Sequence, residues 1–215
     1  MGTKEALLEG ARRCIEENGY ARTTARDIVA ASGTNLGSIG YHFGSTEALL
    51  VEAVGQGFEE WVAHFREMAL AAPEASPLER LSVTWTRMMD DFPRIKPLLV
   101  ALFEAIAQAE RSPELRQRLA ASYDRCRTEV AATIRESLGQ DDASADETPD
   151  VLAAFMNAVA DGFAIQWLLD PERTPSGGQL VRALASAASY TFTNGSSRRS
   201  TTENSSRKRR KRVPR

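Results

Sequence analysis

The sequence predicts an all-α protein with an N-terminal helix-turn-helix domain and a larger C-terminal helical domain. Three observations carry this prediction. Apolar residues recur at three- and four-residue intervals along most of the chain, and Ser-Pro and Gly breaks divide this pattern into successive segments of helical length. No segment alternates polar and apolar residues as a half-buried strand does. The 215 residues suffice for one or two domains with a substantial core.

The N-terminal domain is organised around residues 23–50. Thr24 is predicted to cap a short helix, because Asp27 stands three residues later and completes a capping box. Gly33 can adopt the left-handed conformation that ends such a helix. The first helix of the pair is therefore expected to end just before Gly33.

A second short helix is predicted over residues 36–43. Asn35 can cap it, and its inward residues are Ile39 and Phe43. Two helices joined by three or four residues that include a glycine form a helix-turn-helix. In that motif the second helix enters the DNA major groove.

These residues also resemble the DNA-binding signature of the tetracycline-repressor-like (TetR) family. The matching positions are Thr24, Asp27, Ile28, Gly33, Gly37, Ser38, Ile39, His42, Phe43, Glu47, Ala48, Leu49 and Leu50. The resemblance implies a transcriptional regulator, most often a repressor, that binds a palindromic double-stranded operator as a homodimer. The residues expected to contact DNA are Thr24, Thr34, Asn35, Leu36, Gly37, Ser38, Tyr41, His42 and Thr46.

Three positions depart from the family pattern. Gly40 stands where the family usually has an aromatic residue, Thr46 where it has a lysine, and Leu36 where a polar or basic residue is common. Leu36 can offer only apolar contact, for example to a thymine methyl group. Gly40 and Thr46 favour an alternative, a helical small-molecule-binding protein with a weakened or low-specificity DNA-binding head.

Charge is strongly segregated along the chain. Residues 196–215 carry nine Lys or Arg and one acid, whereas the whole chain has a net charge of −2. Residues 194–215 are therefore expected to be a disordered basic tail. The tail either adds sequence-independent attraction to DNA, which would favour a low-specificity architectural binder, or is a localisation-like or added appendage.

The two domains are expected at residues 1–48 and 49–193. Their helices are predicted over residues 4–18, 24–32, 36–43, 45–70, 77–92, 98–109, 113–138, 149–169 and 178–192. In this prediction Pro93 and Pro97 enclose a turn, and Gly55 and Gly57 weaken or bend the helix that contains them. Asp90 and Asp91 are interpreted as solvated charge.

The C-terminal domain is expected to bind a small hydrophobic or aromatic effector, as the family resemblance implies. Aromatic and Met side chains suit an adaptable apolar cavity, although the sequence favours ordinary core for each of them taken singly. The candidate ligand-binding residues are Trp85, Met88, Met89, Phe103, Tyr123, Arg127, Phe155 and Asn157, with Asp161 and Gln166 as further polar anchors.

A homodimer interface is expected on the last two helices, which form it in the TetR family. The apolar residues of 149–169 occupy more than one helix face, which also indicates a second packing surface. The candidate dimer residues are Phe163, Trp167, Leu180 and Leu184.

Enzymatic, metal and membrane functions are not expected. The sequence lacks a Walker loop, a GxSxG motif and a CxxC motif, and His42 and His64 have no evident catalytic partner. Cys14 and Cys126 are predicted to be reduced and buried. With no metal, cofactor, leader or long apolar run expected, the predicted location is the cytoplasm.

Overall fold

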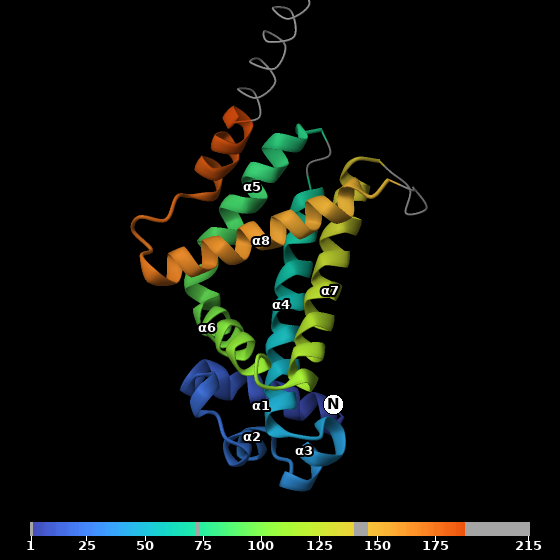
Figure 1. The fold of residues 1–215 in the computed structure, drawn as a ribbon, viewed down its shortest axis with the longest axis vertical. Coiled ribbons are helices and arrows are strands. Elements are labelled where there is room, and N and C mark those ends of the chain that lie inside the picture. The colour runs from blue at the N-terminus through green and yellow to red at the C-terminus, as the bar shows by residue number, and fades with distance from the viewer. Residues whose placement is uncertain (1, 72–73, 140–145, 188–215) are drawn as a thin grey trace, which may run out of the picture.

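The computed structural model describes residues 2–71, 74–139 and 146–187, which are helical and contain no strand. Helices α1–α3 form a lobe at one end of the molecule, and the long helices α4 and α7 run from it side by side (Figure 1). The helices are α1 Thr3–Asn18, α2 Ala25–Ser32, α3 Leu36–Phe43, α4 Thr46–Leu70, α5 Pro77–Asp90, α6 Phe92–Ala109, α7 Pro113–Ser137 and α8 Thr148–Leu169, with a short 3-10 helix, η1, at Tyr20–Arg22.

The predicted helix-turn-helix is confirmed in detail. Thr24 caps α2 in a capping box with Asp27, whose carboxylate accepts from the Thr24 backbone N–H at 3.0 Å. Gly33 ends α2 at φ 67°, in the left-handed region. The Asn35 side chain accepts from the Ser38 N–H at 3.1 Å and so caps α3. The caps therefore fix the turn between α2 and α3.

The lobe of α1–α3, here called the head, and the helices from α4 onward, here called the body, share one apolar core. Buried side chains of α1, among them Leu7 and Ala11, belong to the same cluster as Leu102 of α6 and Leu119 of α7. The boundary expected between residues 48 and 49 falls inside α4, whose first turns complete the core of the head. Helix α4 is therefore packed into both the head and the body.

The glycines of α4 serve helix packing. The helix is unbroken from Thr46 to Leu70, and a Cβ added at Gly55 would lie 2.5 Å from the Ser122 Oγ of α7. A Cβ at Gly57 would lie 3.0 Å from Leu98 of α6. These positions allow α4 to approach α6 and α7 closely, whereas the sequence alone predicted only a weakened or bent helix.

The prediction that Pro93 and Pro97 enclose a turn is wrong, because both residues lie within α6. Helix α6 begins at Phe92, six residues before the predicted start at Leu98, and Pro97 lies within it. Pro93 occupies the first turn, where its missing N–H costs nothing, whereas Pro97 lies inside the helix and cannot donate to the carbonyl of residue 93.

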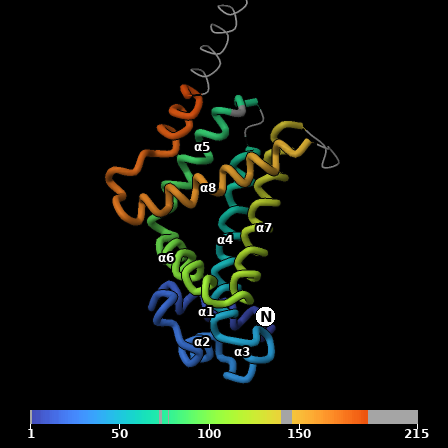
Figure 2. The backbone as a smooth tube through the Cα atoms, in the orientation of Figure 1, coloured from blue at the N-terminus to red at the C-terminus, as the bar shows by residue number. Residues whose placement is uncertain are grey.

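A last helical segment covers residues 177–187 and packs against α5. The trace in Figure 2 shows this segment beside α5, at the end of the molecule far from the head. The predicted helix over residues 178–192 is only partly within the described residues. The predicted basic tail over residues 194–215 lies outside them.

Candidate functional site

Helix α3 presents one face to solvent and the other to the core of the head. Ile39 and Phe43 are 3% exposed, whereas Tyr41 is 85% exposed and Leu36 is 53% exposed. The rings of Tyr41 and His42 meet edge to face with centroids 4.9 Å apart. The outer face thus carries a small aromatic and apolar surface on an α-helix, an element that the major groove admits.

The other predicted DNA-contacting residues surround this face of α3. Asn35 and Gly37 are exposed at its start, Ser38 and Thr34 are partly exposed, and Thr24 is exposed at the start of α2. Thr46 is partly exposed in the first turn of α4. A Cβ added at Gly40 would meet no atom within 4 Å, so the position is open to solvent. The structure brings all nine predicted residues to the ends and outer faces of three neighbouring helices.

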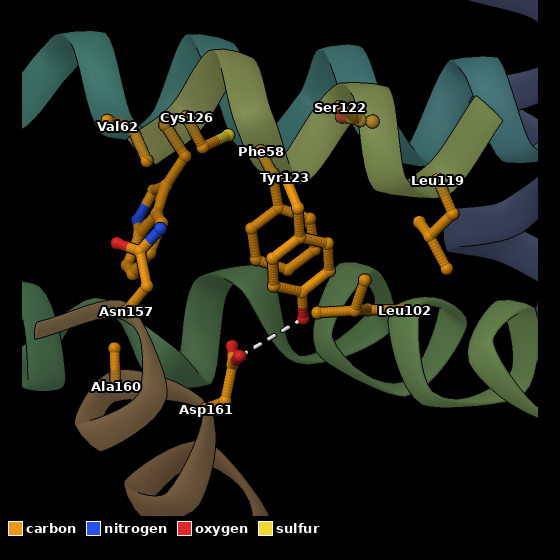
Figure 3. Close-up of a pocket in the computed structure, with 12 residues that line it drawn as sticks. Phe58, Val62, Leu102, Leu119, Ser122, Tyr123, Cys126, Asn157, Ala160 and Asp161 are labelled. Carbon is orange, nitrogen blue, oxygen red and sulfur yellow. Dashed lines mark hydrogen bonds between the residues drawn. The ribbon is translucent and has the colours of Figure 1, made fainter. Parts of the chain in front are cut away.

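A cavity of about 70 Å³ lies in the body between α4, α6, α7 and α8. Its wall is mainly apolar and aromatic (Figure 3). The lining residues are Gly55, Phe58, Trp61, Val62, Leu102, Leu119, Ser122, Tyr123, Cys126, Asn157, Ala160 and Asp161. Four residues of α4 take part, so the helix that begins beside α3 also forms the wall of the cavity.

The polar groups of the cavity come from α7 and α8. The Tyr123 hydroxyl donates to Asp161 Oδ2 at 3.1 Å. Burial raises the pKa of Asp161, and the hydrogen bond from Tyr123 opposes this shift only in part. Burial also raises the pKa of the Cys126 thiol to about 11, which keeps it protonated and unreactive at neutral pH.

The predicted ligand-binding residues divide into two groups. Tyr123 and Asn157 line the cavity, as does Asp161. The others do not. Met88, Met89 and Phe103 belong to or pack on the apolar cluster around Phe92, Trp85 is buried in α5, and Arg127, Phe155 and Gln166 are exposed. Phe58 and Trp61 of α4 were missed because a lining position looks like an ordinary core position in a helical pattern.

Trp61 is held in the cavity wall by Asp91, which joins α5 to α6. The indole Nε1–H donates to Asp91 Oδ2 at 2.8 Å, and Arg94 donates to both carboxylate oxygens at 2.6 and 2.7 Å. The expectation of solvated charge is wrong for Asp91. Its carboxylate lies close enough to α4 to accept the indole N–H of a buried ring.

Asp91→Ala is expected to lower the free energy of unfolding by about 1–3 kcal/mol, since it leaves the largely buried indole N–H unpaired. The Arg94 hydrogen bonds hold the pKa of Asp91 below its usual range. This contribution is present above the unfolded carboxyl pKa of about 3.9 and is lost as pH falls through the lower folded pKa. Urea unfolding at several pH values measures both effects, and the exposed neighbour Asp90→Ala is the control; equal losses in the two variants would contradict the assignment.

Helix α8 carries an apolar stripe that points away from the body. The outer stripe comprises Val151, Phe155, Ala158, Gly162, Ile165 and Leu169, which are spaced three and four residues apart. Val151 is 67% exposed and Leu169 is 81% exposed, and a Cβ at Gly162 would meet nothing within 4 Å. Exposed apolar patches of this kind mark interaction surfaces.

The predicted dimer residues lie on two sides of this part of the fold. Phe163 and Trp167 face inward onto the cluster around Phe92, whose ring centroid lies 5.7 Å from that of Trp167. Leu184 is 42% exposed and Leu180 is partly exposed. Among the helices of the described residues, α8 alone is long and apolar enough to cross a bilayer. The described residues include no group of three potential metal ligands.

Comparison with known proteins identifies the family. Residues 7–53 match the family model described as bacterial regulatory proteins, tetR family, and residues 77–190 match the C-terminal model of BetI-type transcriptional repressors. The chain therefore belongs to the TetR family.

The relatives of this TetR-family chain are transcriptional regulators. It is 30% identical over 185 residues to an HTH-type transcriptional repressor of Mycobacterium tuberculosis, covering 79% of this chain and 86% of the relative. It is 28% identical to the repressor AcnR of Corynebacterium efficiens over 76% of this chain and 80% of AcnR. The protein is thus a DNA-binding transcriptional regulator and not an enzyme.

The fold also matches a solved structure that contains a ligand. The multidrug binding protein EbrR in complex with proflavin superposes with a TM-score of 0.58 and 25% identity, over 86% of this chain and 99% of EbrR.

Proposed function

We propose that this regulator is a homodimeric repressor that binds a palindromic operator and is released by a small hydrophobic or aromatic effector. The observation that carries the proposal is the course of α4. This helix starts three residues after the end of α3 and contributes Gly55, Phe58, Trp61 and Val62 to the cavity. A ligand that moves α4 would therefore move the head, as the shared core requires.

The outer face of α3 is the proposed reading surface. Its exposed residues Leu36, Tyr41 and His42 would meet base edges, while the polar groups at the starts of α2, α3 and α4 would bind phosphates. Residues 1–50 hold five bases and six acids, so binding relies on these short-range contacts more than on bulk charge.

The outer stripe of α8 is the proposed centre of the dimer interface. In a two-fold dimer the same stripe meets its copy, and the small residues Ala158 and Gly162 at its middle would let the two helices approach closely. Leu184 on the helical segment 177–187 is also apolar and exposed, and it is the proposed contribution of that segment to the interface. A dimer buries the apolar face of α8, so this helix requires no membrane, which agrees with the proposed cytoplasmic location.

Release would follow from a change in the separation of the two heads. Adjacent major-groove sites on one face of DNA are ~34 Å apart, and a dimer whose heads no longer match that spacing loses affinity. The cavity is small in this conformation, so a bound ring would push its walls outward. EbrR, which has the same fold, binds proflavin, and this supports an aromatic effector for the present chain.

A footprint on the DNA flanking the protein's own gene tests the proposal. A discrete palindrome is the expected result, whereas diffuse protection would indicate the low-specificity architectural binder and no protection a ligand-binding protein with a degraded head. A screen of hydrophobic compounds should then find ligands that raise the melting temperature of the free dimer and weaken the operator complex. Stabilising ligands that never release DNA would overturn the induction step.

Tyr41→Ala is expected to weaken operator binding by ~1–3 kcal/mol per half-site without lowering the melting temperature, because the ring is exposed and would contact only DNA. Gel shifts at moderate salt and thermal unfolding measure the two effects. Ile39→Ala on the inner face is the matched contrast and should lower stability by ~2–4 kcal/mol. Unchanged operator binding by Tyr41→Ala would show that another surface reads the DNA.

A further inference from the structure

The cavity wall contains one charged side chain. Asp161 of α8 is the single Asp, Glu, Lys or Arg among the residues that line it. The carboxylate points toward Tyr123 across the cavity, as Figure 3 shows. Recognition of a ligand's charge in this site would therefore depend on Asp161.

Asp161 has no cationic partner within the described part of the chain. The basic residues that follow Tyr123 within four positions on α7 are engaged elsewhere: Arg125 donates to Glu59 at 2.9 Å and Arg127 to Asp124 at 2.6 Å. The one hydrogen bond of Asp161 in the described structure comes from Tyr123, and burial raises the carboxyl pKa. A half-buried carboxylate with one neutral donor is incompletely compensated, and a bound cation would supply the missing partner.

Aromatic rings form the wall around this carboxylate. Phe58 and Trp61 of α4 meet edge to face with centroids 6.0 Å apart, and Tyr123 of α7 lines the same cavity. Aromatic faces attract cations as well as apolar rings. The same wall thus suits a flat organic cation better than a neutral or anionic ring of equal size.

We propose that the effector is an aromatic or heteroaromatic cation, such as an amidinium or a protonated ring amine, whose N–H groups bind Asp161. This inference rests on the proposed effector function of the cavity. Asn157, one turn before Asp161 on α8, offers a second polar contact for the same ligand edge. The aromatic part of the ligand would lie against Phe58 and Trp61.

The size of the cavity sets a further requirement. Its volume of about 70 Å³ is below the ~150 Å³ of a protein cavity that holds benzene, so even one ring requires movement of the walls. The wall contributed by α4 leads to the head. Binding of the cation is therefore coupled to the movement that the proposed repressor needs.

Three probes of nearly equal shape test the charge preference: benzamidinium (cation), benzamide (neutral) and benzoate (anion). Calorimetry on the intact protein at neutral pH is expected to give benzamidinium a dissociation constant at least tenfold below that of benzamide, with benzoate the weakest. Asp161→Asn should remove this preference while its amide oxygen still accepts the Tyr123 hydrogen bond. Glu67→Gln, which replaces an exposed acid of α4 outside the cavity, should retain it.

Tyr123→Phe provides an independent check. It frees the carboxylate of its neutral donor, so the preference for benzamidinium should persist or increase. Equal affinities for the three probes, no binding of any of them, or a preference that survives Asp161→Asn would each overturn the inference. A gel shift on the footprinted operator separates this result from the proposed function: a cation that binds through Asp161 without releasing DNA leaves the site assigned and overturns induction alone.

Discussion

Ile165→Asp is expected to produce a folded monomer that binds the operator ~10²–10⁴-fold more weakly, because the second head is no longer held at high effective concentration. Ile165 lies in the outer stripe of α8 and is 44% exposed in the single subunit, so the carboxylate is solvated when the chain is monomeric. In a two-fold dimer the carboxylates of both subunits would be buried in the interface. A buried charge without a partner costs ~3–5 kcal/mol, and the interface would contain two of them.

Analytical ultracentrifugation and gel shifts measure the two parts of this prediction. Val83→Asp is the matched control, because Val83 is 55% exposed on α5 and lies outside the stripe. It should remain dimeric and bind the operator normally. A dimeric Ile165→Asp variant with full operator affinity would contradict the proposed interface, and the apolar surface of α8 would then need another partner.

The local structure of the head could be predicted from the sequence because each signal acts over three or four residues. Thr24 with Asp27 forms the expected capping box, Gly33 takes the expected left-handed conformation, and Asn35 caps α3. Ile39 and Phe43 are buried as their spacing predicted. Caps and inward faces are decided by chemistry within one turn of the helix.

The cavity could not be predicted in the same way. Its walls come from four helices, and in a core-facing stripe nothing distinguishes Trp61, which lines the cavity, from Phe92, which fills the core. Asn157 and Asp161 were singled out as polar groups among apolar helices, and Tyr123 as one of the aromatic residues that suit an apolar cavity. Asp91 was misjudged because its partner, Trp61, is thirty positions away in the sequence.

The sequence showed that α8 is apolar on more than one face, but it did not show which face points outward. Periodicity places Phe155 and Ile165 on one face and Phe163 and Trp167 on another, and both faces are equally apolar. Only the position of α8 against α6 and α7 decides that Trp167 packs on Phe92 while Phe155 is exposed. Orientation of a helix with two apolar faces is a tertiary property.

Gly177→Ala is expected to lower the free energy of unfolding by ~1–3 kcal/mol or more and to weaken the dimer. An added Cβ would lie 2.4 Å from the Thr86 backbone nitrogen and 2.5 Å from the Trp85 carbonyl oxygen. These are backbone atoms inside α5, so they cannot rotate away as a side chain would, and the segment 177–187 must move off α5. That segment carries Leu184, and its displacement would disturb the proposed dimer surface.

The neighbouring glycine supplies the control for this close approach. A Cβ at Gly178 would meet only the Arg182 side chain at 3.3 Å and the Thr86 hydroxyl at 3.4 Å, both ends of side chains that can adjust. Because alanine favours helix by ~1 kcal/mol over glycine, Gly178→Ala should be neutral or slightly stabilising. Thermal and urea unfolding of the two variants test whether stability depends on the close approach at Gly177. If both alanine variants unfold like the original protein, the helical segment does not depend on close contact with α5, and its contribution to the dimer must rest on the exposed face around Leu184 alone.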